Sequence, residues 1–357
     1  MTSVTQRKDT LRFPLVAVLV WGGFQGLLLL LFHGPARGQY FQWDGWWYHQ
    51  ILLHGYVAGG RTATRSTAFF PLLPWITAVI RVVVRSDAIA GLLVEIVATT
   101  AATVLVYLVI TRCRGERVAR LTIVLWLAFP ASIFLWQFYT ESLCVAATAG
   151  AVFFAQENRW RESSALSFAA TMTRLTGAFI VPALMVRAWQ RRQPRRAWML
   201  PAIGAVGFIP VALVQGIQAG EPFGFLAAGR AWGRHLTWPW VGIISFFHHA
   251  TEANRPDVGQ PIDLIAVTLF VVLTILIFHR PWPTELRVFL LLAVVVPLAS
   301  GTLQSGARYM EVAWPGFAVA ADVLDRQPVL IRALVIVGCL FLATMALRAW
   351  SSGLFVG

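Results

Sequence analysis

The sequence predicts an all-α protein that crosses a membrane many times and forms one integral-membrane domain over residues 1–357. Hydrophobic residues make up 58% of the chain and charged residues only 13%. A soluble domain carries roughly 25% charged residues, so this composition excludes a globular enzyme in aqueous solution. Apolar runs of about 20 residues recur along the whole chain, and a helix of that length crosses a bilayer.

Taken in order, these runs predict eleven membrane spans. The first, 13–32, follows a basic segment and is longer than the core of a signal peptide, so we interpret it as an uncleaved transmembrane helix. Two later runs, 163–173 and 175–190, are short and flank Arg174, which indicates half-length helices that meet at the outer surface. The spans are expected near 13–32, 88–111, 118–137, 142–157, 163–173, 175–190, 198–218, 263–279, 288–303, 309–324 and 330–349.

The run at residues 69–84 is ambiguous because it contains Pro71, Pro74 and Arg81. It fits either a spanning helix or a helix that lies in the membrane interface. Basic residues help to choose, because they concentrate in cytoplasmic loops. If the N-terminus is cytoplasmic and 69–84 does not cross, most of the 29 Lys and Arg residues fall on the cytoplasmic side. We therefore favour an interfacial helix.

This topology places two long loops, 33–87 and 219–262, on the non-cytoplasmic side, together with Glu141, Arg174 and Arg308. The net charge of +13 then belongs mainly to loops that face an anionic membrane surface, so we expect no nucleic acid partner. Nearly all basic residues are arginine, which is typical of a GC-rich bacterial genome. We expect a bacterial plasma-membrane protein with its active site on the outer face.

The most informative motif follows the first span and reads FQWDGWWYHQILLHGY over residues 41–56. It places one carboxylate, Asp44, among aromatic side chains that include Trp43 and Tyr48. Aromatic residues at a membrane boundary are ordinary anchors, but an unpaired carboxylate in partly apolar surroundings is costly. The motif indicates chemistry at the membrane surface. A helix N-cap or an interfacial salt bridge is the alternative role for Asp44.

Six motifs follow one another along the chain: WDGWWY…GY at 43–56, AFFPLLP at 68–74, FPASIF…YTESL at 129–143, TRLTG at 173–177, WGR at 232–234 and SGARY at 305–309. In this order they resemble the PIG-V family, the GPI mannosyltransferase II type of membrane glycosyltransferase. The chain departs from the family pattern at Leu52-Leu53, where Ile-Ala is usual, and at Phe129, where Asn is common, and neither change removes an ionisable group.

The resemblance implies the GT-C fold and transfer of a sugar, most simply mannose, from a polyprenyl-phosphate donor to an acceptor on the non-cytoplasmic face. Asp44 matches the acid that such enzymes use as catalytic base. An inverting transfer needs a base for the acceptor hydroxyl, whereas phosphate is already a good leaving group and needs no general acid. The phosphate does need positive charge, and guanidinium groups suit its oxygens. The residues expected to bind substrate are Arg65, Arg174, Arg234 and Arg308, with Trp43, Tyr48, Trp232 and Tyr309 from the same motifs.

Glu141 is the second candidate catalytic acid, either as a second carboxylate, as an acceptor ligand or as the partner of Arg174, although it also fits a helix cap. Glu95 lies within an apolar span and is expected to be buried against an Arg or a Ser/Thr partner. No DxD or HExxH motif is present near the polar loops, so we expect neither a metal nor another cofactor. The acceptor, whether a lipid, a glycolipid or a protein, stays open.

Two other classes of function compete with this hypothesis. A transporter or lipid flippase would place its essential charges near the bilayer midplane and show paired, interrupted helices in two halves. A non-catalytic membrane scaffold would leave the surroundings of Asp44 unexplained. The unusual polar residues gather instead at one predicted interface, which favours a membrane glycosyltransferase.

Overall fold

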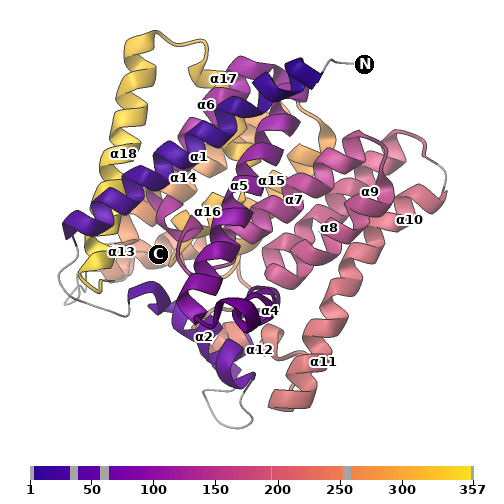
Figure 1. Cartoon of the computed structure of the whole chain (residues 1–357), viewed down its shortest axis with the longest axis vertical. Helices are drawn as coiled ribbons and strands as arrows, with labels where there is room; N and C mark the ends of the chain where they lie inside the picture. The colour runs from indigo at the N-terminus through magenta and orange to yellow at the C-terminus, as the bar shows by residue number, and fades with distance from the viewer. Residues whose placement is uncertain (1–3, 33–38, 57–63, 194, 252–258, 355–357) are drawn as a thin grey trace.

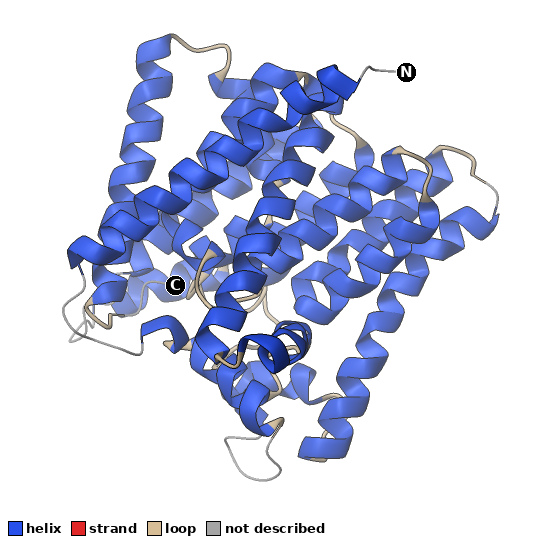
Figure 2. Cartoon of the chain, in the orientation of Figure 1, coloured by secondary structure: helices blue, strands red, loops and turns tan. Residues whose placement is uncertain are grey.

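The chain is all-helical, as the sequence predicts. The computed structural model describes residues 4–32, 39–56, 64–193, 195–251 and 259–354, and within these ranges it contains helices and loops but no strand (Figure 2). Parts of both predicted outer loops, residues 33–38, 57–63 and 252–258, lie outside the described residues.

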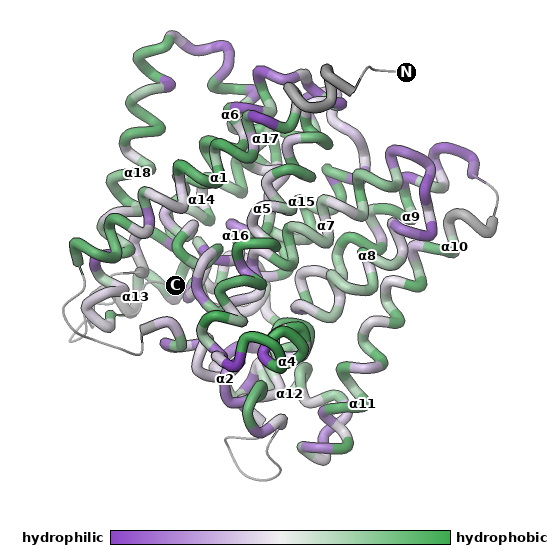
Figure 3. Tube along the Cα trace, viewed as in Figure 1, coloured by the Kyte–Doolittle hydropathy of each residue, from purple (hydrophilic) through white to green (hydrophobic). Residues whose placement is uncertain are grey.

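Five stretches of the described chain are long and apolar enough to cross a membrane, judged by length and composition. Each corresponds to one of the predicted spans, and apolar residues run along them while hydrophilic residues gather near the two ends of the bundle (Figure 3). The stretches are Leu11–Phe32 of α1 (Val4–Phe32), α5 (Asp87–Arg114), Met199–Ala219 through α10 (Arg195–Ile203), η4 (Gly204–Gly207) and α11 (Phe208–Ala219), Pro261–Phe278 of α14 (Gly259–Phe278), and α18 (Val329–Ser351).

The remaining predicted spans are shorter or interrupted, so the count of eleven stays a prediction. The span expected at 118–137 begins as α6 (Glu116–Ala128) and continues as the 3-10 helix η2 (Pro130–Leu135), because Pro130 cannot continue the α-helical hydrogen bonding. All six residues of η2 are buried, and irregular backbone at membrane depth is tolerated where protein encloses it. The other segments are α7 (Glu141–Gln156), α8 (Trp160–Thr173), η3 (Leu175–Phe179), α9 (Ile180–Gln190), α15 (Thr284–Leu298), α16 (Gly306–Val312) and α17 (Pro315–Leu324).

Short helices gather at one end of the bundle, the lower end in Figure 1. Among them, α4 (Leu72–Val84) packs against α2 (Asp44–His54) and α5. Its 13 residues span about 20 Å, which is less than the roughly 30 Å of a hydrocarbon core, and its valines Val79, Val82 and Val83 are exposed. This geometry fits the interfacial alternative for residues 69–84. The other short elements are η1 (Gln39–Phe41), α12 (Gly224–Ala231) and α13 (Val241–Thr251).

Buried tryptophans connect the middle of the bundle to α16, the helix that later carries a site arginine. The indole N–H of Trp126 on α6 donates to the backbone carbonyl of Glu311, 3.1 Å away. The indole of Trp314 donates to Thr148 Oγ1 on α7 at 3.2 Å. These bonds satisfy donors that would be costly to bury unpaired, and they fix α16 and α17 against α6 and α7.

Glu95 on α5 is fully buried, and the Ser142 hydroxyl donates to its carboxylate. This contact confirms the expectation that a residue of the Arg or Ser/Thr class would be its partner.

Candidate active site

A cavity of about 1190 Å³ opens at the end of the bundle where the short helices gather. Motifs that lie far apart in the sequence line it together. Eight of the ten residues predicted for the site face this cavity: Trp43, Asp44, Tyr48, Arg174, Trp232, Arg234, Arg308 and Tyr309. The other two contact residues that line it: Glu141 pairs with Arg174, and Arg65 lies over the ring of Trp232.

Two carboxylates and two guanidinium groups form one connected network, called here the charged wall. Its members are Asp44, Glu141, Arg174 and Arg308. Arg308 contacts Asp44 through Nη1 and Oδ2 at 2.6 Å, and contacts Glu141 through Nε and Oε1 at 3.1 Å. Arg174 Nη1 lies 2.5 Å from the same Glu141 oxygen. The Glu141 side chain is only 2% exposed, so its two arginine partners offset the cost of burying its charge. Glu141 is therefore the partner of Arg174, one of the three roles open to it.

A short, locally constrained turn positions Asp44, the first residue of α2. The Asp44 backbone N–H donates to the Tyr139 hydroxyl at 3.2 Å, and that hydroxyl donates to the carbonyl of Gln42 at 3.3 Å. Trp43 has φ of 52°, a conformation that non-glycine residues rarely adopt and that costs about 1–3 kcal/mol. Strain of this kind persists where surrounding contacts hold it, and here it aims the Asp44 carboxylate into the cavity.

The start of α16 positions Arg308, and it depends on a residue that the sequence analysis did not single out. The carboxylate of Asp263 on α14 accepts the backbone N–H of Ser305 at 3.0 Å and that of Ala307 at 2.8 Å. These are donors at a helix N-terminus, which otherwise lack intrahelical partners. A Cβ on Gly306 would lie 2.7 Å from Val267, so glycine permits the close approach of α16 to α14. In sequence, Asp263 stands at the start of an apolar span, without a motif around it.

Arg174 lies where the helical path breaks between α8 and η3, as the two short apolar runs predicted. Its backbone is extended, with φ of −173°, and the helix resumes only after it. A Cβ on Gly177 would lie 2.0 Å from the carbonyl oxygen of Ala170, so the chain can fold back on itself only with glycine there. The R-x-x-G spacing thus has a structural reason, because the glycine permits the break that presents the arginine.

The ring of Tyr309 lies close to two arginines. The guanidinium carbon of Arg174 is 5.2 Å from its centroid and that of Arg234 is 5.0 Å away. Arg234 also donates to the backbone carbonyl of Gln304 at 3.0 Å. Within the described residues Arg234 forms no ion pair with a carboxylate, so its charge is available to an anion in the cavity.

Aromatic rings form a second part of the cavity lining, called here the aromatic wall. Trp47, Phe69 and Trp232 have ring centroids 5.8 to 6.0 Å apart. The Arg65 guanidinium carbon lies over the Trp232 ring, 5.5 Å from its centroid, and the Arg65 backbone carbonyl accepts the indole N–H of Trp232 at 3.3 Å. The predicted contact of Arg65 with a phosphate stays a prediction, because its guanidinium supports the wall and does not line the cavity.

Tyr48 joins the aromatic wall to the charged one. Its hydroxyl lies 3.2 Å from Thr140 Oγ1, next to Glu141 in the sequence. Burial raises the pKa of the Tyr48 hydroxyl above its ordinary value, so it remains a protonated hydrogen-bond donor.

The cavity carries a surplus of positive charge. Four arginines line it, including Arg230, which stands two residues before the WGR motif and was missed because it belongs to no motif. Asp44 and the adjoining Glu141 are the carboxylates of the network, which leaves two positive charges in excess. Such a site is suited to an anion. The described residues contain no group of three or more His, Cys, Asp or Glu side chains arranged to hold a metal ion.

Comparisons with known proteins establish the fold. No protein-family model and no curated protein matches the chain. Among solved structures, it is similar to the oligosaccharyltransferase of Archaeoglobus fulgidus, with a TM-score of 0.55 and 13% identity over 95% of this chain and 53% of that one. It is also similar to ArnT from Cupriavidus metallidurans, solved with undecaprenyl phosphate, with a TM-score of 0.55 and 15% identity over 98% of this chain and 77% of that one.

The protein has the GT-C fold. The long apolar helices and these neighbours identify an integral membrane protein, as composition predicted. The chain spans about half the length of the oligosaccharyltransferase. At these low identities the likeness is one of fold, so assignment to the PIG-V family stays a prediction.

Proposed function

We propose that this GT-C protein is a membrane glycosyltransferase that uses a polyprenyl-phosphate sugar as donor. The observation that carries the proposal is the Asp44 carboxylate, held 2.6 Å from Arg308 in a large cavity with surplus positive charge. The solved ArnT structure with the same fold contains undecaprenyl phosphate, which is a ligand of the proposed class. The resemblance of the motifs to the PIG-V family supports mannose as the sugar and the non-cytoplasmic face of the membrane as the site of transfer.

Asp44 acts as the base in the proposed reaction. Its carboxylate takes the proton of the acceptor hydroxyl as that oxygen attacks the sugar carbon, and the bond from this carbon to the phosphate oxygen breaks with inversion. Because the departing phosphate carries its own negative charge, no proton donor is required. Asp44 is the only carboxylate among the described residues that line this cavity, which favours it over Glu141 for contact with the acceptor.

Arginines of the cavity bind the phosphate in the ground state and stabilise the charge that develops as it leaves. Arg174 and Arg234 both lie over the Tyr309 ring, and Arg308 on α16 lines the same cavity. Guanidinium groups form charge-assisted hydrogen bonds with phosphate oxygens, and such bonds strengthen as the leaving oxygen gains charge. The aromatic wall offers apolar surface to the sugar ring and the first prenyl units. The acceptor is a lipid, a glycolipid or a protein.

Substitution of the base tests the proposal most directly. Asp44→Asn keeps the size of the side chain but cannot accept the proton, so sugar transfer should fall about 10²- to 10⁴-fold. The measurement is transfer from radiolabelled polyprenyl-phosphate mannose to a membrane extract, together with binding of undecaprenyl phosphate to the purified protein. Binding should persist, because the arginines and the apolar wall remain.

Asp87→Asn is the matched control. Asp87 is a carboxylate at the same end of the bundle, paired with His49 at 2.9 Å and Arg81 at 3.2 Å, and it does not line the cavity. Near-normal transfer by Asp44→Asn would remove Asp44 as base and make Glu141 the preferred candidate. Wild-type protein that binds undecaprenyl phosphate and moves it across vesicles without transferring a sugar would instead identify a flippase.

A further inference from the structure

A second cavity, of about 680 Å³, lies at the opposite ends of the helices that build the active site. Helix α7 begins with Glu141 beside the active-site cavity and ends with Gln156, which lines the second one. Helix α15 contributes Glu285 from its first turn to the second cavity and Pro297 from its last turn to the active-site cavity. Because the 16 residues of α7 extend for about 24 Å, the two cavities are separate sites near opposite membrane surfaces.

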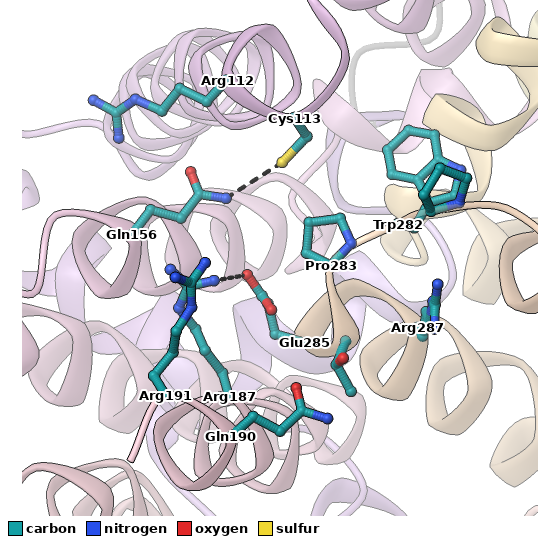
Figure 4. Close-up of a pocket in the computed structure, with 12 residues that line it drawn as sticks. Arg112, Cys113, Gln156, Arg187, Gln190, Arg191, Trp282, Pro283, Glu285 and Arg287 are labelled. Atoms are coloured by element: carbon teal, nitrogen blue, oxygen red, sulfur yellow. Dashed lines mark hydrogen bonds and ion pairs between the residues drawn. The ribbon is translucent and has the colours of Figure 1, made fainter. Parts of the chain in front are cut away.

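The second cavity is also strongly cationic. Four arginines line it, Arg112, Arg187, Arg191 and Arg287, against a single carboxylate, Glu285 (Figure 4). Arg187 forms an ion pair with Glu285, and the two side chains are only 12% and 3% exposed. This pair uses the one acidic group of the cavity, so the other three arginines have no carboxylate partner inside it.

These arginines retain unused hydrogen-bond donors. Arg112 reaches Glu157 outside the cavity at 2.7 Å. Arg287 donates through Nη2 to the carbonyl of Arg280 at 2.7 Å, but its Nε and that of Arg187 are buried without a hydrogen-bond partner. Arg191 makes no ion pair with the side chains that the structure describes, and it lines the same cavity as Arg187 and Glu285 (Figure 4). Buried donors normally have partners, so the Nε groups of Arg187 and Arg287 lack an acceptor, while Arg191 adds an exposed positive charge to the same cavity.

The geometry points to a binding site for a phosphate group in this cavity, contacted by Arg191 and Arg287 and bordered by the Arg187–Glu285 pair. Phosphate matches the site because its oxygens accept several guanidinium hydrogen bonds at once and its charge offsets the excess of arginine. Trp282 and the prolines at 281 and 283 add apolar surface at the border. Basic pockets between transmembrane helices bind anionic lipid headgroups, and a free phosphate-containing anion presents the same oxygens.

Two arms of one experiment distinguish these sources. Purified, delipidated protein in an uncharged detergent is titrated with phosphatidylglycerol and followed by native mass spectrometry, with zwitterionic phosphatidylcholine as the comparison lipid. The same preparation is titrated with inorganic phosphate in a calorimeter. Arg191→Gln and Arg287→Gln are measured beside the wild type, and Arg191 lies on the surface, so its replacement leaves the packed core intact.

Arg326→Gln is the matched control, because Arg326 is 67% exposed, lies after α17 and lines neither cavity. We expect one of the two anions to bind the wild type, and each cavity variant to weaken that binding about tenfold or more, since each removes a charge-assisted hydrogen bond. If the cavity variants lose binding of phosphatidylglycerol, the ligand is a lipid headgroup. If they lose binding of inorganic phosphate instead, the ligand is a soluble anion. Absence of binding to the wild type, or equal binding by all three variants, would overturn the proposal.

Discussion

The two ends of the bundle each contain a buried arginine–glutamate pair, but the pairs differ in what surrounds them. At the active-site end, Arg174 and Glu141 are 12% and 2% exposed, and at the other end Arg187 and Glu285 are 12% and 3% exposed. Burial alone therefore does not separate them. Glu141 is shared with Arg308, which also contacts Asp44, whereas Glu285 has Arg187 as its one ion-pair partner within the described residues.

Under the proposed function, this difference separates a network that takes part in the reaction from a pair that mainly stabilises the fold. In the network of four charges, Arg174 contacts Glu141, Glu141 contacts Arg308, and Arg308 contacts Asp44. Asp44, at the end of this chain of contacts, lines the large cavity. In the Arg187–Glu285 pair, Arg187 is the one ion-pair partner of Glu285 within the described residues, so substitution of either residue should affect folding more than sugar transfer. The following substitutions test that distinction.

The largest effect is expected for Arg308→Gln. This change leaves Asp44 and Glu141 without one of their partners, and breaking a buried ion pair costs about 3–5 kcal/mol. Sugar transfer should fall at least as far as in Asp44→Asn, because the variant loses phosphate binding as well as the position of the base. Thermal unfolding in detergent and the transfer assay measure the two losses. A variant of wild-type stability would show that the network is not coupled.

Glu285→Gln should separate stability from activity. It leaves Arg187 buried without a carboxylate, so the free energy of unfolding should fall by about 3–5 kcal/mol. Transfer per folded molecule should remain near that of the wild type, because α15 reaches the active site only through its other end. Activity normalised to the folded fraction is the measurement. A loss of that specific activity by tenfold or more would make the two ends one functional unit.

Arg234→Gln should weaken donor binding with little change in stability. Arg234 donates to the backbone of Gln304 and stacks on Tyr309, and it holds no buried carboxylate. Loss of a charge-assisted hydrogen bond to phosphate is worth about 1.5–3 kcal/mol, which corresponds to roughly 10- to 100-fold in the affinity for undecaprenyl phosphate. An unchanged affinity together with reduced transfer would assign Arg234 to the leaving group alone.

The smallest effect is expected for Arg120→Ala, at the surface of the opposite end. Its ion pair with Glu116 at 2.6 Å is about half exposed on both sides, and pairs of this i,i+4 type contribute about 0.3–0.5 kcal/mol. The Arg120 hydrogen bonds lower the pKa of the Glu116 carboxyl below its ordinary 4.5, so this contribution is present above pH 4.5 and is lost as pH falls. The free energies of unfolding of the variant and the wild type should therefore become equal as the pH falls below 4.5.

Eight of the ten residues chosen from the sequence line the same cavity, because the motifs are local and each brings its neighbours with it. Their roles in binding and catalysis stay predictions. The break at Arg174 was visible as two short apolar runs, and Glu95 was correctly expected to have a polar partner. The sharing of Glu141 between two arginines was not predictable, since it depends on how α7, α8 and α16 pack together.

Other features of the site could not be predicted either, because they also depend on how separate helices pack together. Asp263 acts across two helices on the start of α16, and no periodicity marks it. Arg230 lacks a motif, although it faces the cavity from α12. The span expected as a single helix at 118–137 breaks at Pro130, where close packing encloses irregular backbone. Hydropathy averages over such breaks and does not detect them.

The contact between Asp44 and Arg308 has a kinetic consequence under the proposed function. The carboxylate that must accept a proton is engaged by the Arg308 guanidinium, 2.6 Å away. A donor phosphate competes for that guanidinium and releases the carboxylate toward the acceptor hydroxyl. The enzyme should therefore add its substrates in a compulsory order, donor first. Polyprenyl phosphate should inhibit competitively against the donor but not against the acceptor, and an acceptor alone should find no site prepared for it.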